Sequence, residues 1–193
     1  MSRHILLIQG HPDSSELHLC HALAGSYVQG ALDAGHEVRR CELADLDFPL
    51  LRSQKDFDNG VVPEQLQSVQ SDILWCNHMV LFFPLWAGDM PALLKGMLEQ
   101  VFRPAFTGTS RNPLATKPLS GRSARVVVTM GMPALVYRWY FRAHSVKALE
   151  RNMLGMVGIG PVRETLIGLT GDLSASQAQD WLSILRKLGA QGA

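Results

Sequence analysis

This chain of 193 residues has few cysteines, a net charge near zero and no long apolar run. Its three cysteines, Cys20, Cys41 and Cys76, are odd in number and form no C-x-x-C pair, which argues against a disulfide framework or a thiolate zinc site. Lys and Arg number 18 against 17 Asp and Glu, so no general field favours nucleic acid or an anionic membrane. The longest apolar stretch, residues 79–87, is too short for a bilayer and contains Pro84. These absences predict a cytoplasmic protein without a nucleic-acid partner.

Several familiar catalytic and phosphate-binding motifs are also missing. No G-x-G-x-x-G follows the first apolar run and no G-x-x-x-x-G-K-[ST] occurs, so a nicotinamide Rossmann site and a P-loop have no support. No G-x-S-x-G occurs, which removes support for a hydrolase elbow. His11, His18 and His21 lie close in sequence, but they have no acidic partner at ligand spacing and no H-E-x-x-H exists. We therefore predict no metal site.

The residues that are present predict an ordinary globular α/β domain. Hydrophobic residues make up 47% and charged residues 18%, which excludes disorder for the chain as a whole. Apolar runs predict strands at residues 5–8, 36–43, 79–83, 124–129 and 162–169. Periodic patterns predict helices at residues 15–32, 63–75, 91–102, 137–154 and 174–188, with surface loops at 44–62 and 103–121. The alternation predicts βαβ units in a doubly wound parallel sheet, and no repeat or linker divides residues 1–193.

Three loops follow the carboxyl ends of the first, third and fourth predicted strands. With the strand order 2-1-3-4-5 these loops form one continuous rim, which is where open α/β sheets bind ligands. The first loop, residues 10–15, precedes a predicted helix and offers the hydroxyl of Ser14 or Ser15 and backbone N–H groups to a phosphate. A helix cap without a ligand explains the same residues.

The other two loops suit a planar ligand. Residues 84–89 place Trp86 beside Gly88, which gives a flat apolar wall with free backbone amides, although the indole equally suits a core gap or a subunit interface. Residues 129–133 keep Gly131 small, which allows the edge of a ligand to approach, and they also suit a simple turn.

These loops resemble those of the flavodoxin-like NAD(P)H:quinone oxidoreductases. Gly10-His11-Pro12 with Ser14-Ser15 is similar to the opening motif of that family. Residues 83–96, FPLWAGDMPALLKG, are similar to its most specific signature, and residues 99–102 continue it. The resemblance implies a single flavodoxin-like flavin-binding domain over residues 1–193, with a five-stranded parallel sheet in the order 2-1-3-4-5.

The same resemblance implies an enzyme and its cofactors. The family binds a flavin tightly, FMN or FAD, is reduced by NADH or NADPH, and transfers two electrons to a quinone or a similar acceptor. One face of the ring would be free, so the nucleotide and the quinone-like molecule would use one pocket in turn, in a ping-pong mechanism. The family also implies a homodimer. The chain matches the size of shorter bacterial relatives, some of which accompany potassium-efflux transporters, which implies a transient partner in the membrane.

Motif position assigns site residues to the flavin. The phosphate and ribityl region would contact His11, Leu17 and His18, together with Ser15. The ring would lie along Pro84, Leu85, Trp86 and Ala87, with its other edge at Thr129, Met130, Gly131 and Met132. Tyr137 falls where the family has a tyrosine that assists hydride transfer, and His144 lies one position from the companion histidine.

The sequence departs from the family at the ring. Trp86-Ala87-Gly88 replaces a bulkier and more aromatic triplet, which predicts an altered acceptor pocket. Met130 and Met132 replace polar or small residues, which leaves fewer hydrogen bonds to the ring. Two other functions stay open. One is a regulatory subunit whose flavin senses redox state for a potassium-efflux-type transporter, and the other is a flavodoxin-like electron carrier, which the near-zero net charge disfavours.

Overall fold

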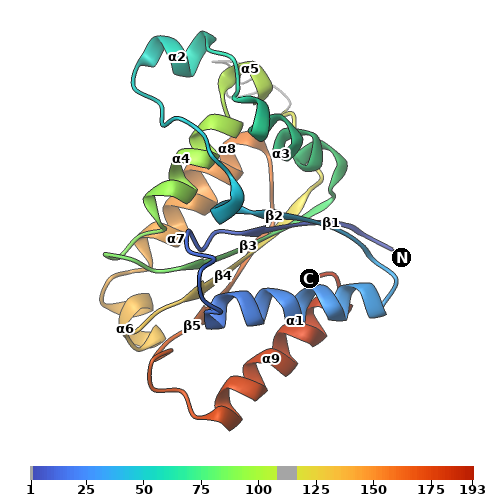
Figure 1. Ribbon diagram of the computed structural model, residues 1–193, viewed down its shortest axis with the longest axis vertical. Helices are drawn as coiled ribbons and strands as arrows, with labels where there is room; N and C mark the ends of the chain where they lie inside the picture. The colour runs from blue at the N-terminus through green and yellow to red at the C-terminus, as the bar shows by residue number, and fades with distance from the viewer. Residues whose placement is uncertain (1, 108–116) are drawn as a thin grey trace.

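The computed structural model describes residues 2–107 and 117–193. Its centre is a five-stranded parallel sheet in the order β2-β1-β3-β4-β5 (Figure 1). The strands are β1 (His4–Gln9), β2 (Glu37–Glu42), β3 (His78–Pro84), β4 (Ser123–Thr129) and β5 (Val162–Ile167). The predicted flavodoxin-like sheet and its strand order are therefore confirmed.

Helices cover both faces of the sheet (Figure 1). One face packs against α1 (Leu19–Asp33) and α9 (Ala175–Ala190). The other packs against α3 (Glu64–Trp75), α4 (Ala92–Val101) and the consecutive elements α7 (His144–Ala148), η2 (Leu149–Leu154) and α8 (Gly155–Val157). The shorter elements are η1 (Leu43–Asp45), α2 (Gln54–Asn59), α5 (Pro104–Thr107) and α6 (Ala134–Trp139).

The central strand explains why the sequence shows apolar runs without alternation. Every residue of β3 is buried, because helices cover both of its faces. Leu81 and Phe83 pack toward α3 and α4, whereas Val80 and Phe82 pack toward α1 and α9. Each such side chain contributes about 2 kcal/mol on burial, so two separate cores hold the sheet between its helix layers.

Two glycines allow α1 and α9 to touch. A Cβ added to Gly30 of α1 would lie 1.9 Å from the backbone oxygen of Arg186, and one added to Gly189 of α9 would lie 2.0 Å from that of Tyr27. No side chain fits at either distance. The close contact of these helices therefore depends on glycine at both positions.

The predicted helix start at residue 15 is wrong, because α1 begins at Leu19. The Asp13 carboxylate accepts hydrogen bonds from the backbone N–H and the hydroxyl of Ser15, at 2.8 and 2.6 Å, and these hold the preceding residues in a turn. His18 is the N-cap, and its N–H donates to the imidazole of His21 at 3.3 Å.

The two predicted surface loops contain helices as well. Within residues 44–62 lie the end of η1 and the whole of α2, whose N-cap Ser53 accepts a hydrogen bond from the N–H of Asp56 at 3.0 Å. The second loop, 103–121, contains α5, and its residues 108–116 lie outside the described part of the chain. These elements are shorter than two turns, so they leave too few periodic positions to be recognised in the sequence.

The single helix predicted over residues 137–154 is also wrong. The chain instead forms α6, then α7, then the π-helical η2 and α8. Arg142 and Ala143 have positive φ angles of 55° and 49°, which end helical geometry between α6 and α7. The predicted strand over 162–169 ends at Ile167, and Leu169 has a φ of 55°.

Candidate flavin site

The first loop begins where β1 leaves the sheet. The N–H of Gly10 donates to the carbonyl of Phe82 at 2.6 Å, and a Cβ at Gly10 would lie 2.6 Å from Leu94 and 2.9 Å from that carbonyl. Glycine is therefore required for this loop to cross the end of β3. The loop then presents His11, which is 5% exposed, at the carboxyl end of the sheet.

Gln9 positions His11 and was not found from the sequence. It is 1% exposed, and its side-chain oxygen accepts hydrogen bonds from the N–H of His11 at 3.1 Å and the thiol of Cys20 at 3.3 Å. Its amide donates to the carbonyl of Cys20 at 3.1 Å. One buried amide thus joins the end of β1, the loop and α1. In the sequence, the only sign of this positioning role is that a polar residue ends an apolar strand.

Three imidazoles gather beside this loop. His11 stacks on His18 with ring centroids 4.0 Å apart, and His21 lies 5.1 Å from His11 and 5.7 Å from His18. Burial, followed by the charges of the neighbouring imidazoles, lowers the pKa of His11, and burial followed by His18 lowers the pKa of His21. Mutual repulsion of their cations would be relieved by a bound anion, so the cluster suits a phosphate.

Asp13 limits the positive charge of this cluster. Its carboxylate lies 3.0 Å from Nε2 of His18 and accepts the two hydrogen bonds from Ser15. The Ser15 hydroxyl, followed by His18, holds the pKa of the Asp13 carboxyl well below its usual range. Ser15 therefore uses its hydroxyl within the loop, whereas the predicted contact residue Leu17 is 96% exposed.

The second loop forms a tight turn after β3. Trp86 and Asp89 exchange backbone hydrogen bonds at 2.8 and 2.9 Å, and between them Ala87 and Gly88 have φ angles of 48° and 83°. Half of the Trp86 side chain remains exposed, and its ring edge lies over His11 with centroids 5.6 Å apart. The structure thus brings the first two predicted loops into direct contact.

The third loop joins this rim through β4. The N–H of Leu85 donates to the carbonyl of Thr129 at 2.8 Å, and the N–H of Met130 donates to Ile167 at 2.9 Å. Pro84, Thr129 and Met130 are buried at the base of the rim, where β3 and β4 end. A Cβ at Gly131 would meet nothing within 4 Å, so the space above this loop is open.

The donors of this rim fit a phosphorylated flavin. In residues 2–107 and 117–193, the backbone N–H groups of Glu16, Leu17, Gly131 and Met132 make no hydrogen bond. Backbone N–H groups and imidazoles recognise phosphate and the carbonyl edge of a planar ring. The half-exposed Trp86 adds an apolar surface beside them. The residues present therefore suit the cofactor that the sequence predicts.

Tyr137 and His144 differ in how far they are exposed to solvent. Tyr137 is 1% exposed, and its hydroxyl accepts a hydrogen bond from the N–H of Val146 at 3.4 Å. Burial raises its pKa, while the neighbouring Val146 and Ser145 lower it. His144, at the start of α7, is exposed. The break between α6 and α7, absent from the prediction, separates the two residues onto different elements.

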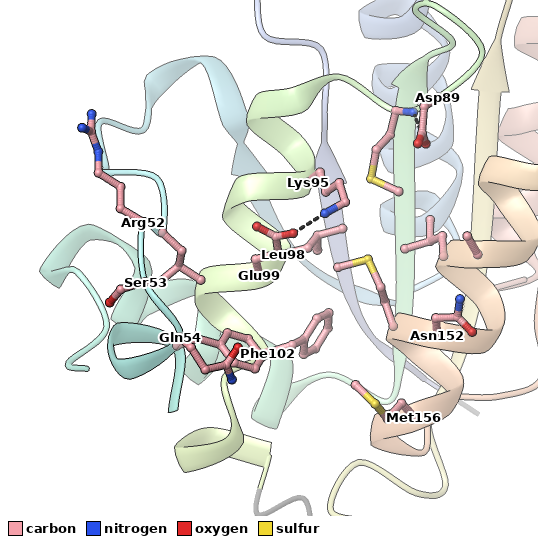
Figure 2. A pocket seen from close by; sticks show the side chains of 16 residues that line it. Arg52, Ser53, Gln54, Asp89, Lys95, Leu98, Glu99, Phe102, Asn152 and Met156 are labelled. Carbon is pink, nitrogen blue, oxygen red and sulfur yellow. Dashed lines mark hydrogen bonds and ion pairs between the residues drawn. The ribbon is translucent and has the colours of Figure 1, made fainter. Parts of the chain in front are cut away.

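A cavity of about 610 Å³ adjoins the second loop on the α4 side of the sheet. Figure 2 shows it between α4 and the η2–α8 segment, with residues 51–57 on a third side and Asp89 at one end. Ser145 donates a hydrogen bond to the Asp89 carboxylate, which connects the loop to α7. No local sequence motif indicates this cavity, because segments that are separated along the chain form it together.

The described residues offer neither a cluster of metal ligands nor a membrane-spanning helix. No group of three or more His, Cys, Asp or Glu in the described ranges is arranged to hold a metal ion. Across the same residues, none of the helices has both the length and the apolar character that crossing a membrane requires.

A doubly wound parallel sheet with the strand order 2-1-3-4-5 defines a flavodoxin-like class of protein, and its ligand site is expected at the carboxyl ends of the strands, where His11 meets Trp86. The chain belongs to the Flavodoxin-like fold family, which it matches over residues 3–188. The resemblance inferred from the loop motifs is confirmed.

Individual relatives have similar folds and related names. An uncharacterized NAD(P)H oxidoreductase of Haemophilus influenzae is 26% identical over 167 residues, which cover 84% of this chain and 82% of that protein. The structure of an NAD(P)H:quinone oxidoreductase from Methanothermobacter marburgensis superposes with a TM-score of 0.82 at 20% identity, covering 99% of this chain and 97% of the other. An FMN-dependent NADH-azoreductase from Bacillus anthracis, in complex with FMN, superposes with a TM-score of 0.73 at 19% identity, covering 97% and 98%.

Proposed function

We propose that the protein is a flavin-dependent NAD(P)H:acceptor oxidoreductase that reduces quinones or similar electrophilic acceptors by two electrons. The observation that supports this most is the contact between His11 and Trp86 beside unpaired backbone N–H groups, at the carboxyl ends of three strands. Membership of the family and the names of its relatives agree with this activity.

The proposed cofactor is FMN or FAD. His11 and His18 would hold its phosphate with the backbone N–H groups of residues 16 and 17, and Ser15 would support them through Asp13. Residues 84–87 and 129–132 would line the ring. When bound, the flavin accepts a hydride from NADH or NADPH and passes two electrons to the acceptor.

We further assign Tyr137 and His144 to the transfer step. The imidazole of His144 is exposed, so it can donate a hydrogen bond to a bound ligand. The buried hydroxyl of Tyr137 contacts Val146 on α7, the element that begins with His144. Tyr137 therefore also fixes the position of α7.

Shared use of one ring face gives the kinetic prediction. The nucleotide must leave before the acceptor binds, so double-reciprocal plots should be parallel lines, as in a ping-pong mechanism. Intersecting lines would contradict a shared pocket.

The proposed assembly is a homodimer with each flavin near the interface. The side chains of Trp139, Tyr140 and Phe141 are 76%, 79% and 44% exposed, and they follow the rim on α6 and just after it. Adjacent exposed aromatics are typical of interaction sites. Trp139→Arg should weaken the dimer in light scattering, whereas Ile184→Arg on α9 should not. A monomer at all concentrations would refute the proposal.

The decisive experiment identifies the flavin and its reductant. Purified protein should be yellow with one flavin per chain, and heat denaturation should release FMN or FAD for chromatography. Anaerobic mixing with NADH or NADPH should bleach the flavin absorbance, and a quinone should restore it. His11→Ala should lose the flavin, whereas His4→Ala, at the other end of β1, should retain it.

The remaining outcomes separate the alternatives. A colourless protein that takes up neither FMN nor FAD at micromolar concentration would refute the cofactor. A yellow protein that neither nucleotide reduces would instead support a regulatory subunit for a membrane transporter or a flavodoxin-like electron carrier. The three free cysteines are all buried, which agrees with the proposed cytoplasmic location.

A further inference from the structure

A second polar cluster lies at the opposite end of the sheet from the flavin rim. Arg3 precedes β1, His78 begins β3, Ser123 and Arg125 begin β4, and Arg163 lies near the start of β5. Strand pairing places Ile5 beside His78, His78 beside Ser123, and Arg125 beside Arg163. The parallel sheet thus gathers four basic side chains at the amino-terminal ends of its strands, which we call its amino edge. For strands of this length, the amino edge lies about 20 Å from the rim.

Unlike Arg39, Arg138 and Arg186, the three arginines of this cluster form no ion pair with a carboxylate of the described residues. Arg39, Arg138 and Arg186 each pair with an Asp or Glu at 2.6–2.7 Å. In the part of the chain that the structure describes, Arg3, Arg125 and Arg163 pair with none.

The hydrogen bonds within the cluster leave its charge uncompensated. Arg3 donates to the Ser123 hydroxyl at 3.3 Å, and Arg125 donates to the Thr165 hydroxyl at 2.8 Å. Both acceptors are neutral. Three guanidinium charges therefore lie together without an ion-pair partner in residues 2–107 and 117–193.

His78 adds an unpaired buried group. Its side chain is 3% exposed, and its Nδ1 lies 2.8 Å from the Ser123 hydroxyl. The same hydroxyl accepts a hydrogen bond from Arg3, so it joins the imidazole to the guanidinium group. Nε2 is buried and has no hydrogen-bond partner among the described residues. Within the described residues, the cluster thus combines three unpaired guanidinium charges with a buried imidazole nitrogen that has no hydrogen-bond partner.

A hollow of about 200 Å³ opens among these residues. Arg3, His78, Ser123 and Arg163 line it, and Arg125 lies behind them in β4. Ala193 also borders the hollow. The volume is below that of pockets for drug-sized ligands, so it suits a small ion.

We propose that this hollow binds a small oxyanion of the phosphate and sulfate class, held by Arg3 and Arg163 in the field of Arg125. Such an ion supplies several acceptor oxygens and negative charge, which are the two things that this edge of the sheet lacks. Guanidinium groups form paired hydrogen bonds with tetrahedral oxyanions, which a single ammonium does not. Because the residue before β1 and strands β3, β4 and β5 all contribute, the bound ion would stabilise the sheet at its amino edge.

The test measures anion binding with the flavin-loaded protein. Inorganic phosphate, sulfate and glycerol phosphate are titrated separately by calorimetry at constant ionic strength set with chloride, while the flavin absorbance is followed. We expect saturable binding of one ion per chain without loss of flavin. Stronger binding of inorganic phosphate and sulfate indicates a free ion as the natural ligand, and stronger binding of glycerol phosphate indicates a phosphate ester.

Charge-matched variants locate the site. Arg163→Gln should weaken binding about tenfold, because it removes a charged donor, and the exposed position should tolerate the change. Arg3→Gln is a second variant. Arg151→Gln, on η2 across the sheet, removes the same charge and should retain binding within about twofold. If Arg163→Gln and Arg151→Gln weakened anion binding equally, the loss would reflect the overall charge of the protein and not a local contact. That result would overturn the proposed site.

A local signal separates this site from the flavin rim. A bound anion favours the cationic imidazole, so phosphate should raise the pKa of His78, as measured by NMR of its imidazole resonances. No saturable binding at millimolar phosphate would overturn the proposal, and so would displacement of flavin by phosphate with His78 unaffected. If the protein holds no flavin at all, the same titration with Arg163→Gln still tests the anion site independently.

Discussion

Acid should destabilise this fold through His78. The imidazole is almost fully buried at the start of β3. Burial, followed by the charges of Arg3, Arg125 and Arg163, lowers its pKa from 6.5 to about 4. The folded chain therefore keeps this group neutral at a pH where the unfolded chain protonates it.

The sign and size of the effect follow from linkage. The stability associated with neutral His78 is complete above the unfolded pKa of 6.5 and is lost as the pH falls toward about 4. One pKa unit corresponds to about 1.4 kcal/mol, so the full loss is about 3 kcal/mol. About 2 kcal/mol of it should be lost by pH 5. Against a total stability of about 10 kcal/mol, this loss is readily measured.

Urea unfolding at pH 8 and pH 5 tests the prediction. His78→Asn removes the titrating group while it keeps a polar side chain, and His144→Asn is a control that removes an exposed imidazole. Protein and FMN concentrations stay constant, and buffers contain no phosphate or sulfate, because a bound ligand changes apparent stability. Between the two pH values, the parent and His144→Asn should each lose about 2 kcal/mol more than His78→Asn. Equal losses in the parent and His78→Asn would refute the reasoning.

Three further perturbations test other parts of the molecule. Replacing both Ser15 and His18 by leucine should abolish flavin retention, measured by absorbance after gel filtration; full retention would exclude them from the site. Tyr137→Phe and His144→Ala should each slow anaerobic flavin reduction about a hundredfold in stopped flow without loss of flavin; unchanged rates would remove their role. Gly30→Ala should destabilise the fold by about 3 kcal/mol or more in thermal unfolding, because its Cβ would lie 1.9 Å from an oxygen of α9; a change below about 0.5 kcal/mol would contradict the close helix contact.

Local patterns were sufficient for the sheet. The run Met79 to Phe83 is continuously apolar because both faces of β3 are covered, and this appears directly in the sequence. Ser174 begins α9 with a capping box, a signal confined to four residues. The motif at residues 83–96 likewise needed only its own spacing to indicate the family.

Helix ends were less predictable, because they depend on single contacts. The carboxylate of Asp13 holds the loop before α1, and positive φ angles at Arg142 and Ala143 divide the segment after β4. Neither interrupts the apolar periodicity from which helices are recognised. The sequence therefore did not predict how Tyr137 and His144 are placed relative to each other, because this depends on the break between α6 and α7.

The arrangement of side chains around both sites depended on tertiary structure alone. His11 contacts Trp86 because β1 and β3 are adjacent in the sheet, although the two residues are far apart in the chain. Arg3 precedes β1, whereas His78 and Arg163 lie in β3 and β5, and the three residues show no common motif, yet parallel pairing brings them to one hollow. Sequence spacing records which residues neighbour each other along a strand or helix. Only strand order and register determine which charges and rings meet across the sheet, since those contacts form between distant segments when the chain folds.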